Sequence, residues 1–371
     1  AENRLHLYTA PWIATGDDDL AEVHPLEDVI AIDRIGYVRE LVWHANPLAA
    51  FNTAFFLLEP NDCLSHHSGL GEPFNLFVSR GEIQRPPLYP RATIFQQADG
   101  SWTTGTFGLD DMDLYVGDDP TALPFAVDTP ARLTAYTRGW AIALHGQVIG
   151  FTPSAPERHE FTIVNRQVVS YKQGGKLEIP QNGFVLSCAP EALTDADRAK
   201  LLAGRVSYRF RQAHHAGIRQ ALQAGPQLLA DGAVSLTDDT LAEEAFWTDR
   251  PLPDGSHEVG VVPTMFPLDV DRTRAGRVGV GVTRAGEILV TVLVGSETGG
   301  VRDARLDSAG ATLVELAEFM AEMGAFQAVN MDGGGSSQLF FLSGLATVAG
   351  GRLGLQSVHY ERMVPSVGIV R

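Results

Sequence analysis

The sequence predicts an α+β fold built from mainly antiparallel, mixed sheets with a few packed helices. Many short β-rich runs are separated by Gly, Pro, Asn and Asp, which is typical of antiparallel strands joined by turns. Helical patterns are fewer, and they do not alternate with strands as in a series of βαβ units. The strand-like runs are Asn75–Val78, Arg132–Tyr136, Ala141–Leu144, Thr162–Val169 and Phe184–Ser187.

Three segments have the apolar spacing of a helix. The clearest is Ala311–Gly324, where Thr312 and Glu315 have the spacing of a capping box. Asp195–Leu202 follows a threonine that can cap it, and Ala213–Gln223 is the third candidate. We expect helices at all three places.

The C-terminal third is predicted to run strand, strand, helix, strand, strand. Val278–Thr283 and Ile288–Val294 precede the helix, and a glycine-containing turn separates them. Ala328-Val329 and the apolar run that begins at Gln338 follow the helix. This order is consistent with an α+β layout.

Composition and charge exclude several classes of protein. The chain has 371 residues, of which 44% are hydrophobic and 20% charged, as in a globular protein. Its net charge of −17 argues against a nucleic-acid partner and against an anionic membrane surface. The sequence contains no apolar run long enough to span a bilayer. A start at Ala1-Glu2 is compatible with a mature protein exported to the periplasm or the medium.

The most informative stretch is the block from Asn330 to Ser337, which contains a carboxylate, an amide, three consecutive glycines and two hydroxyls. Three adjacent glycines pack nothing and cost backbone entropy, so they indicate a sharp turn or the close approach of a ligand. We expect Asp332 to act as nucleophile or general base. We expect the neighbouring polar groups to bind a ligand, with the glycine N–H groups forming an anion nest. These ligand-binding candidates are Asn330, Gly333, Gly334, Gly335, Ser336 and Ser337.

Four further residues are weaker candidates for the same site. Asn52 lies among apolar residues and binds either a ligand or its own backbone. Asp62 is the candidate second carboxylate, although Asn-Asp pairs are also common in turns. Arg277 leads into a buried strand and is a candidate anion clamp. His67 lies near the Asn52 segment and is a candidate substrate contact.

The sequence shows no sign of a metal or another cofactor. The adjacent histidine pairs are poor chelates, because neighbouring residues on a strand face opposite ways. The acidic run from Asp110 to Asp119 lacks the spacing of a calcium loop, which favours a solvated face. Cys63 and Cys188 either form one disulfide or are two buried thiols.

These motifs, in this order, resemble the phosphodiester glycosidase family. The resemblance starts at Asn52-Thr-Ala-Phe-Phe56 and Asp62-Cys-Leu64, and it is most specific in the last hundred or so residues. The C-terminal motifs are Arg277-Val-Gly-Val-Gly281, Gly310-Ala-Thr-Leu-Val-Glu-Leu-Ala317, Asn330-Met-Asp-Gly-Gly-Gly-Ser336 and Arg362-Met-Val-Pro-Ser-Val367. Thr53 and Ala54 stand where the family has glycines, and Val278 replaces its usual threonine, so the substrate sugar is open.

The resemblance implies a phosphodiester-glycosidase-like domain over residues 52–371. It leaves residues 1–51 unassigned, and we expect them to add strands to the same domain. Residues 233–260 are polar, acidic and aromatic, and they are either a flap or a surface insertion. The implied reaction is hydrolysis of the anomeric C–O bond of a sugar-1-phosphodiester, with Asp332 as key carboxylate. Two alternatives stay open: a glycoside hydrolase on the same scaffold that acts on exopolysaccharide or oligosaccharide linkages, and a non-catalytic carbohydrate-binding envelope protein.

Overall fold

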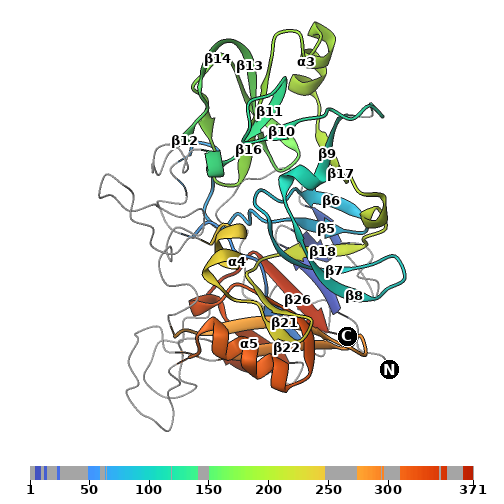
Figure 1. Cartoon of the computed structure of the whole chain (residues 1–371), viewed down its shortest axis with the longest axis vertical. Coiled ribbons are helices and arrows are strands. Elements are labelled where there is room, and N and C mark those ends of the chain that lie inside the picture. Colours follow the sequence, from blue (N-terminus) through green and yellow to red (C-terminus); the bar gives the residue numbers. More distant parts are fainter. Residues whose placement is uncertain are drawn as a thin grey trace.

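The computed structural model describes residues 5–9, 12–14, 23–25, 49–58, 63, 65–117, 119–140, 150–246, 274–293, 295, 310–341, 344–348 and 362–370. Figure 1 shows these residues as a stack of sheets with few helices. In this part of the chain all paired strands are antiparallel except β10 and β11. The expectation of mainly antiparallel sheets with few helices is confirmed.

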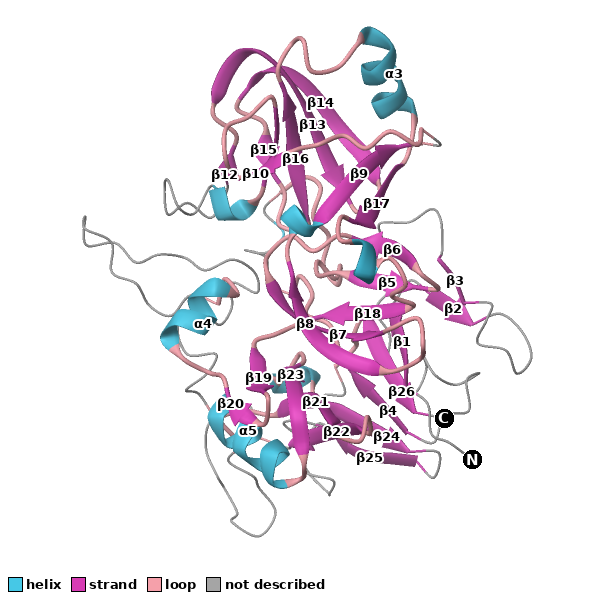
Figure 2. Ribbon diagram, turned by 45° about the vertical axis from the view of Figure 1, so that its right-hand side comes forward, coloured by secondary structure: helices cyan, strands magenta, loops and turns pink. Residues whose placement is uncertain are grey.

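Two of the sheets carry the Asp332 segment. The terminal sheet combines both ends of the chain, in the order β1 (Leu5–Thr9), β26 (Ser366–Val370), β4 (Ala49–Asn52), β24 (Gln338–Phe341) and β25 (Gly344–Val348). The helix-backed sheet has the order β20 (Ala233–Val234), β19 (Gln227–Ala230), β23 (Ala325–Asn330), β21 (Arg277–Thr283) and β22 (Ile288–Leu293). Both lie in the lower half of the molecule in Figures 1 and 2.

Two further sheets build the middle and the top of the molecule (Figure 2). The central sheet has the order β6 (Glu82–Arg85), β5 (Phe77–Ser79), β18 (Gln220–Gln223), β7 (Arg91–Gln96) and β8 (Trp102–Phe107). The upper sheet has the order β10 (Ala126–Val127), β11 (Leu133–Tyr136), β16 (Gly183–Cys188), β13 (Ser154–Val164) and β14 (Gln167–Gly175). Two-stranded ribbons pair β2 (Trp12–Ala14) with β3 (Val23–Pro25), β9 (Met112–Val116) with β17 (Val206–Phe210), and β12 (Gly150–Phe151) with β15 (Glu178–Ile179).

The alternation of side chains along β21 determines how the helix-backed sheet packs. Its valines point into the largest apolar core, which also contains Phe161 of the upper sheet and Ile94 of the central sheet. Its glycines face α5 (Leu313–Glu322), because a Cβ atom on Gly279 would lie 2.5 Å from Met320 Sδ. Small residues on that face let the helix lie directly on the sheet.

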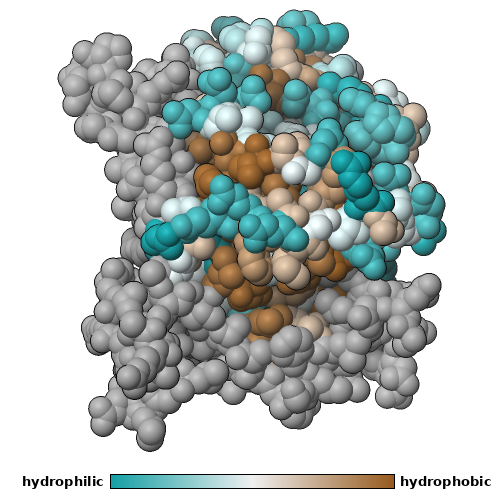
Figure 3. Space-filling model, turned by 60° about the horizontal axis from the view of Figure 1, so that its bottom comes forward, coloured by the Kyte–Doolittle hydropathy of each residue, from teal (hydrophilic) through white to brown (hydrophobic). Residues whose placement is uncertain are grey.

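The other face of α5 is turned outward. Val314, Phe319 and Met323 are exposed there, whereas the apolar residues that face the sheet are buried. This helix lies at the bottom of the molecule in Figure 1, and the bottom view of Figure 3 shows apolar side chains gathered on this end of the described surface.

Several predicted elements are confirmed. Asp195–Ala203 forms α3 with the expected threonine cap, and α5 has the expected capping box between Thr312 and Glu315. The predicted order of strand, strand, helix, strand, strand is that of β21, β22, α5, β23 and β24. The local signals in this part of the sequence agree with the tertiary fold.

Two predicted elements are wrong. Thr162–Val169 is a hairpin rather than one strand, because the chain reverses at Asn165, whose φ of 55° is left-handed. Ala213–Gln223 is not a helix: a 3-10 turn at Ala213–His215 leads into β18, which lies in the middle of the central sheet. Sheet pairing overrides helical spacing there. The predicted strand Ala141–Leu144 lies outside the described residues.

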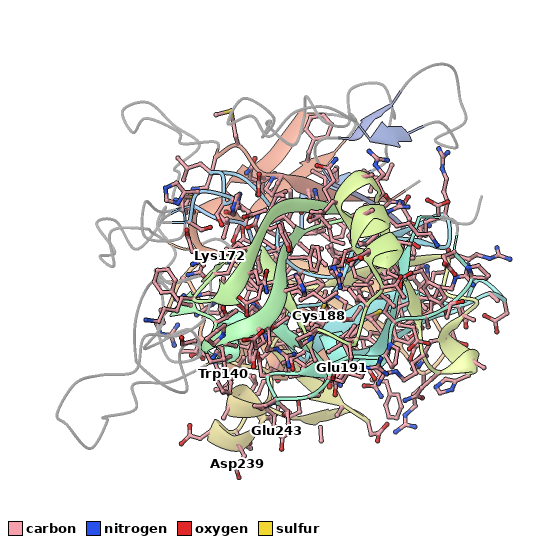
Figure 4. All side chains as sticks on the ribbon, turned by 90° about the horizontal axis from the view of Figure 1, so that it is seen from above. Trp140, Lys172, Cys188, Glu191, Asp239 and Glu243 are labelled. Carbon is pink, nitrogen blue, oxygen red and sulfur yellow. The ribbon has the colours of Figure 1, made fainter. Side chains whose placement is uncertain are left out.

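Residues 233–260 are described only as far as residue 246. They contain β20 and the short helix α4 (Asp238–Glu243). Figure 4 shows Asp239 and Glu243 at the periphery of the molecule, and both are exposed, whereas Leu241 is buried. The predicted flap or insertion beyond this helix lies outside the described residues.

Replacing Gly368 with alanine is expected to destabilise the terminal sheet. Gly368 lies opposite Phe51 in the pairing of β26 with β4, and a Cβ atom there would overlap the buried Phe51 ring. We expect Gly368→Ala to lower the free energy of unfolding by about 1–3 kcal/mol in denaturant titrations. Adding Phe51→Leu makes room, so the double variant should lose less than the sum of the two single losses. Strict additivity would contradict this packing.

Candidate functional site

The Asp332 segment connects two sheets. Strand β23 of the helix-backed sheet ends at Asn330, and β24 of the terminal sheet begins at Gln338. Between them, Gly334–Ser336 forms a single 3-10 turn. The expectation that this polar block lies between two strands is confirmed, and the two strands belong to different sheets.

The backbone of the segment is held from both sides. The Asp332 N–H donates to the Thr53 carbonyl, directly after β4, at 2.8 Å. The Gly334 N–H donates to the Gly276 carbonyl, directly before β21, at 2.7 Å. The position of the segment therefore depends on both sheets.

The Asn52 side chain binds both ends of the segment and acts as a clamp between them. Its Nδ2 donates to the Asp332 carbonyl at 2.7 Å, and its Oδ1 accepts the Gln338 N–H at 2.8 Å. The side chain is fully buried. Because both ends of the amide bind backbone groups of the segment, Asn52 positions it. That Asn52 also contacts the substrate stays a prediction.

Asp332 has an unusual carboxyl environment. The residue is partly exposed, but its Oδ2 atom is buried and has no hydrogen-bond partner among the described residues. Burial raises the pKa of this carboxyl from its ordinary value to about 7, against hydrogen bonds from Ser336 and the Gly333 N–H and the positive charge of Arg362, which lower it. A carboxyl that titrates near neutral pH is suited to proton transfer.

The glycines shape the segment more than they expose donors. Gly334 has a left-handed φ of 56°, which favours glycine, and a Cβ atom on Gly333 would lie 2.8 Å from the Gly276 carbonyl oxygen. The Gly333 N–H binds the Asp332 carboxylate, and the Gly334 N–H binds the Gly276 carbonyl. That the three N–H groups form an anion nest stays a prediction, although the Gly334 N–H already has a backbone partner. The role of Gly335 stays a prediction.

The other polar residues of the block, Asn330, Ser336 and Ser337, are buried. A hydrogen bond with the Ser336 side chain lowers the pKa of the Asp332 carboxyl. Asn330 is buried, and its Nδ2 donates to the Gly225 carbonyl at 2.9 Å. Ser337 is also fully buried. That these residues contact a substrate stays a prediction.

A buried glutamate, Glu244, which the sequence did not indicate, lies beside Gly225, whose carbonyl accepts the Asn330 amide. A Cβ atom on Gly225 would lie 2.6 Å from the Glu244 carboxylate. This carboxylate accepts the N–H groups of Ala92 at 2.8 Å and Gln227 at 2.7 Å. Glu244 thus connects the end of α4 to the central and helix-backed sheets beside the Asp332 segment.

The two arginines near the segment have different surroundings. Arg277 is 6% exposed, and its Nε donates to the Ala311 carbonyl at 2.9 Å, just before α5. Arg362 is partly exposed, and its charge lowers the pKa of Asp332. The predicted anion clamp at Arg277 stays a prediction, while the charge of Arg362 lowers the pKa of the Asp332 carboxyl. The sequence showed Arg362 only as the start of a C-terminal motif.

The remaining candidates lie along the chain after Asn52. Asp62, the candidate second carboxylate, lies outside the described residues. His67 is partly exposed, and its backbone N–H donates to Ser65 Oγ at 3.2 Å. On the same stretch, burial raises the pKa of Glu72 to about 6, against the charge of Arg85, which lowers it.

No group of three or more His, Cys, Asp or Glu side chains suited to a metal ion occurs among the described residues. Cys63 and Cys188 are not joined by a disulfide. Figure 4 shows Cys188 within the body of the molecule, and burial raises the pKa of its thiol. In the described part of the chain, no helix is long and apolar enough to cross a membrane.

The chain belongs to the phosphodiester glycosidase family, which it matches over residues 158–370. This match includes the Asp332 segment, α5 and β26. It confirms the resemblance drawn from the sequence. No protein of curated function matches the chain.

Two solved structures of distant proteins show a similar fold. A hypothetical protein from Synechocystis has a TM-score of 0.53 and 18% identity, and the match covers 99% of this chain and 56% of that one. A Burkholderia pseudomallei protein named as exported has a TM-score of 0.53 and 20% identity, covering 100% of this chain and 71% of that one. The catalytic domain of zebrafish N-acetylglucosamine-1-phosphodiester alpha-N-acetylglucosaminidase, auto-inhibited by its propeptide, has a TM-score of 0.41 and 13% identity, covering 91% and 67%. This chain thus spans little more than half of the Synechocystis protein.

Removing the Asn52 amide is expected to loosen the Asp332 segment. Asn52→Ala leaves the Asp332 carbonyl and the Gln338 N–H without their buried partner, which should cost about 2–3 kcal/mol of unfolding free energy in denaturant titrations. The control Gln97→Ala removes an exposed amide and should change stability by less than about 0.5 kcal/mol. Unchanged stability of Asn52→Ala would contradict the clamp.

Replacing Asp332 with asparagine is expected to stabilise the protein in a pH-dependent way. Between about pH 4 and pH 7 the unfolded carboxyl is ionised while the folded one keeps its proton, so the wild type loses stability as pH rises through this window. The asparagine side chain of the variant does not titrate. The free energy of unfolding of Asp332→Asn should therefore exceed that of the wild type by more at pH 8 than at pH 4, and the two differences should be apart by on the order of 2 kcal/mol. Melting temperatures measured at both pH values should show the same trend. A gap independent of pH would contradict the raised pKa.

Proposed function

We propose that this protein hydrolyses the anomeric C–O bond of a sugar-1-phosphodiester, with Asp332 as the key carboxylate. The observation that carries this proposal is the carboxyl of Asp332, whose pKa is about 7 and whose position is fixed by Asn52 and Ser336. Membership of the phosphodiester glycosidase family supports the reaction class.

The chemistry explains why one well-placed carboxylate can suffice. Cleavage of an ordinary glycoside needs an acid to protonate an alkoxide leaving group, so two carboxyl groups are expected. Here the C1–O bond breaks with its electron pair leaving on a phosphate monoester, which is stable without a proton. Water supplies the oxygen that bonds to C1, and Asp332 either takes the proton of that water or first bonds to C1 itself. Inversion at C1 corresponds to the first route and retention to the second.

The proposal is tested by comparing three proteins on three kinds of substrate. Wild type, Asp332→Asn and the surface control Glu318→Gln are assayed on UDP-N-acetylglucosamine, methyl-phospho-sugars and p-nitrophenyl glycosides. We expect turnover of a phospho-sugar, a loss of at least about a hundredfold in kcat for Asp332→Asn, and no change for the control. Because Asp332 acts in its ionised form, kcat/KM should rise with pH up to about 7 and then level off.

Two outcomes would contradict the proposal. Turnover confined to aryl or oligosaccharide glycosides would instead support a glycoside hydrolase on the same scaffold. Full activity of Asp332→Asn would remove Asp332 from the reaction. If phospho-sugars are hydrolysed, proton nuclear magnetic resonance of the first sugar released distinguishes inversion from retention at C1.

A further inference from the structure

The Asp332 segment lies against a second crossing of the chain between two sheets, which runs from β18 of the central sheet to β19 of the helix-backed sheet. This crossing holds Asn330, two residues before Asp332. The Gly225 N–H donates to the Asn330 carbonyl at 3.0 Å, and Asn330 Nδ2 donates to the Gly225 carbonyl at 2.9 Å. The Asn330 N–H donates to the Pro226 carbonyl at 3.0 Å. The start of the Asp332 segment therefore takes its position from Gly225 and Pro226.

The buried side chain of Glu244 fixes this crossing. Its Oε1 accepts the Gln227 N–H at 2.7 Å, and its Oε2 accepts the Ala92 N–H at 2.8 Å. A Cβ atom on Gly225, whose φ of 88° is left-handed, would lie 2.6 Å from Oε2, so the carboxylate packs directly on the Gly225 backbone. A displacement of this carboxylate would displace Gly225 and, through it, Asn330.

The turn that follows Glu244 reaches the other side of the Asp332 segment. A Cβ atom on Gly225 would lie 3.0 Å from the Phe246 ring, whose centre is 6.1 Å from that of the Phe55 ring. Phe55 comes two residues after Thr53, whose carbonyl accepts the Asp332 N–H at 2.8 Å. The turn at the end of α4 thus packs against both pieces of backbone that hold Asp332.

Arg91 of β7 keeps this turn in place. Its Nε donates to the Glu244 carbonyl at 3.1 Å, and its Nη2 donates to the Ala245 carbonyl at 3.4 Å. The central carbon of its guanidinium lies 4.1 Å from the centre of the Phe246 ring. Because Arg91 is fully buried, the Glu244 carboxylate is held by the core of the molecule as well as by α4.

We propose that Glu244 is a positioning residue for Asp332. It holds Gly225, and thereby Asn330, in the arrangement that keeps the Asp332 carboxyl buried and directed toward a substrate. Two carboxylate oxygens suit this role, because they accept two N–H groups and donate none. The effect of Glu244 on catalysis rests on the proposed function, whereas its effect on the Asp332 carboxyl does not require turnover.

Three variants separate positioning from the effect of charge. Glu244→Gln keeps the size of the side chain, but its NH2 group would face one of the two N–H donors. Glu244→Asp keeps the negative charge, but the shorter side chain cannot reach both donors. The control is Glu243→Gln, which removes an exposed carboxylate from the same helix at the periphery of the molecule (Figure 4).

The first test reads the Asp332 carboxyl without any ligand. As pH rises, the wild type loses stability relative to Asp332→Asn until the pH equals the pKa of the folded carboxyl, about 7. In the Glu244→Gln and Glu244→Asp backgrounds this loss should end at a pH lower by about half a unit to one unit, because a looser segment admits water and reduces the effect of burial. Glu243→Gln should leave this pH unchanged.

The second test uses a phospho-sugar that the wild type hydrolyses, well below the melting temperature of every variant. We expect Glu244→Gln and Glu244→Asp to lower kcat by about ten- to a hundredfold and to change KM by less than about twofold, because a displaced carboxyl impairs the reaction more than binding. Glu243→Gln should match the wild type. If Glu244 served only to attach α4 to the sheets, its variants would lose stability and keep the wild-type kcat.

The possible outcomes separate this inference from the proposed function. A lowered Asp332 pKa in both Glu244 variants, in a protein that turns over no phospho-sugar, would support the positioning role and contradict the proposed reaction. An unchanged pKa in both variants would overturn the positioning role even if phospho-sugars were hydrolysed. A shift in Glu244→Gln alone would also overturn it, since loss of the charge would then be the cause. If Glu244→Gln does not fold, Glu244→Asp decides in the same way.

Discussion

The pair of hydrogen bonds made by the Asn52 amide is the interaction on which the rest of the site depends. The segment that carries Asp332 leaves one sheet and enters another, so neither sheet alone fixes its path. One buried amide satisfies a carbonyl at the start of this segment and an N–H at its end. An unpaired polar group in this interior would cost more than an ordinary hydrogen bond contributes, so the path between the sheets is tightly specified.

The structure places the uncommon electrostatics of the site on this rigid frame. A buried carboxyl with an unpaired oxygen is unfavourable when it is ionised, and the protein tolerates it because Ser336, Gly333 and Arg362 offset part of that cost. Near this segment, the Glu244 carboxylate joins the end of α4 to the central and helix-backed sheets by accepting one backbone N–H from each. Such a combination of a destabilised charge and a well-packed support is typical of functional sites.

The sequence predicts some levels of this organisation better than others. Alternating valines and glycines in β21 and the capping box of α5 are local signals, and the structure bears them out. The 3-10 turn and strand in place of a helix at residues 213–223 could not be foreseen, because sheet pairing with distant strands decides that region. In the site, the composition of the Asp332 block indicated a special backbone. The roles of Asn52 and Glu244 depend on partners far away in sequence, which no local pattern contains.

The clamp also makes assembly of the site depend on residues that are far apart in the chain. Asn52 and the Asp332 carbonyl that it binds are 280 residues apart. The Ser366 hydroxyl, still closer to the C-terminus, accepts the N–H that lies two residues after Asn52. A growing polypeptide emerging from the ribosome therefore cannot assemble this site until Ser366 has been synthesised, and the slow closure of such long loops delays it further.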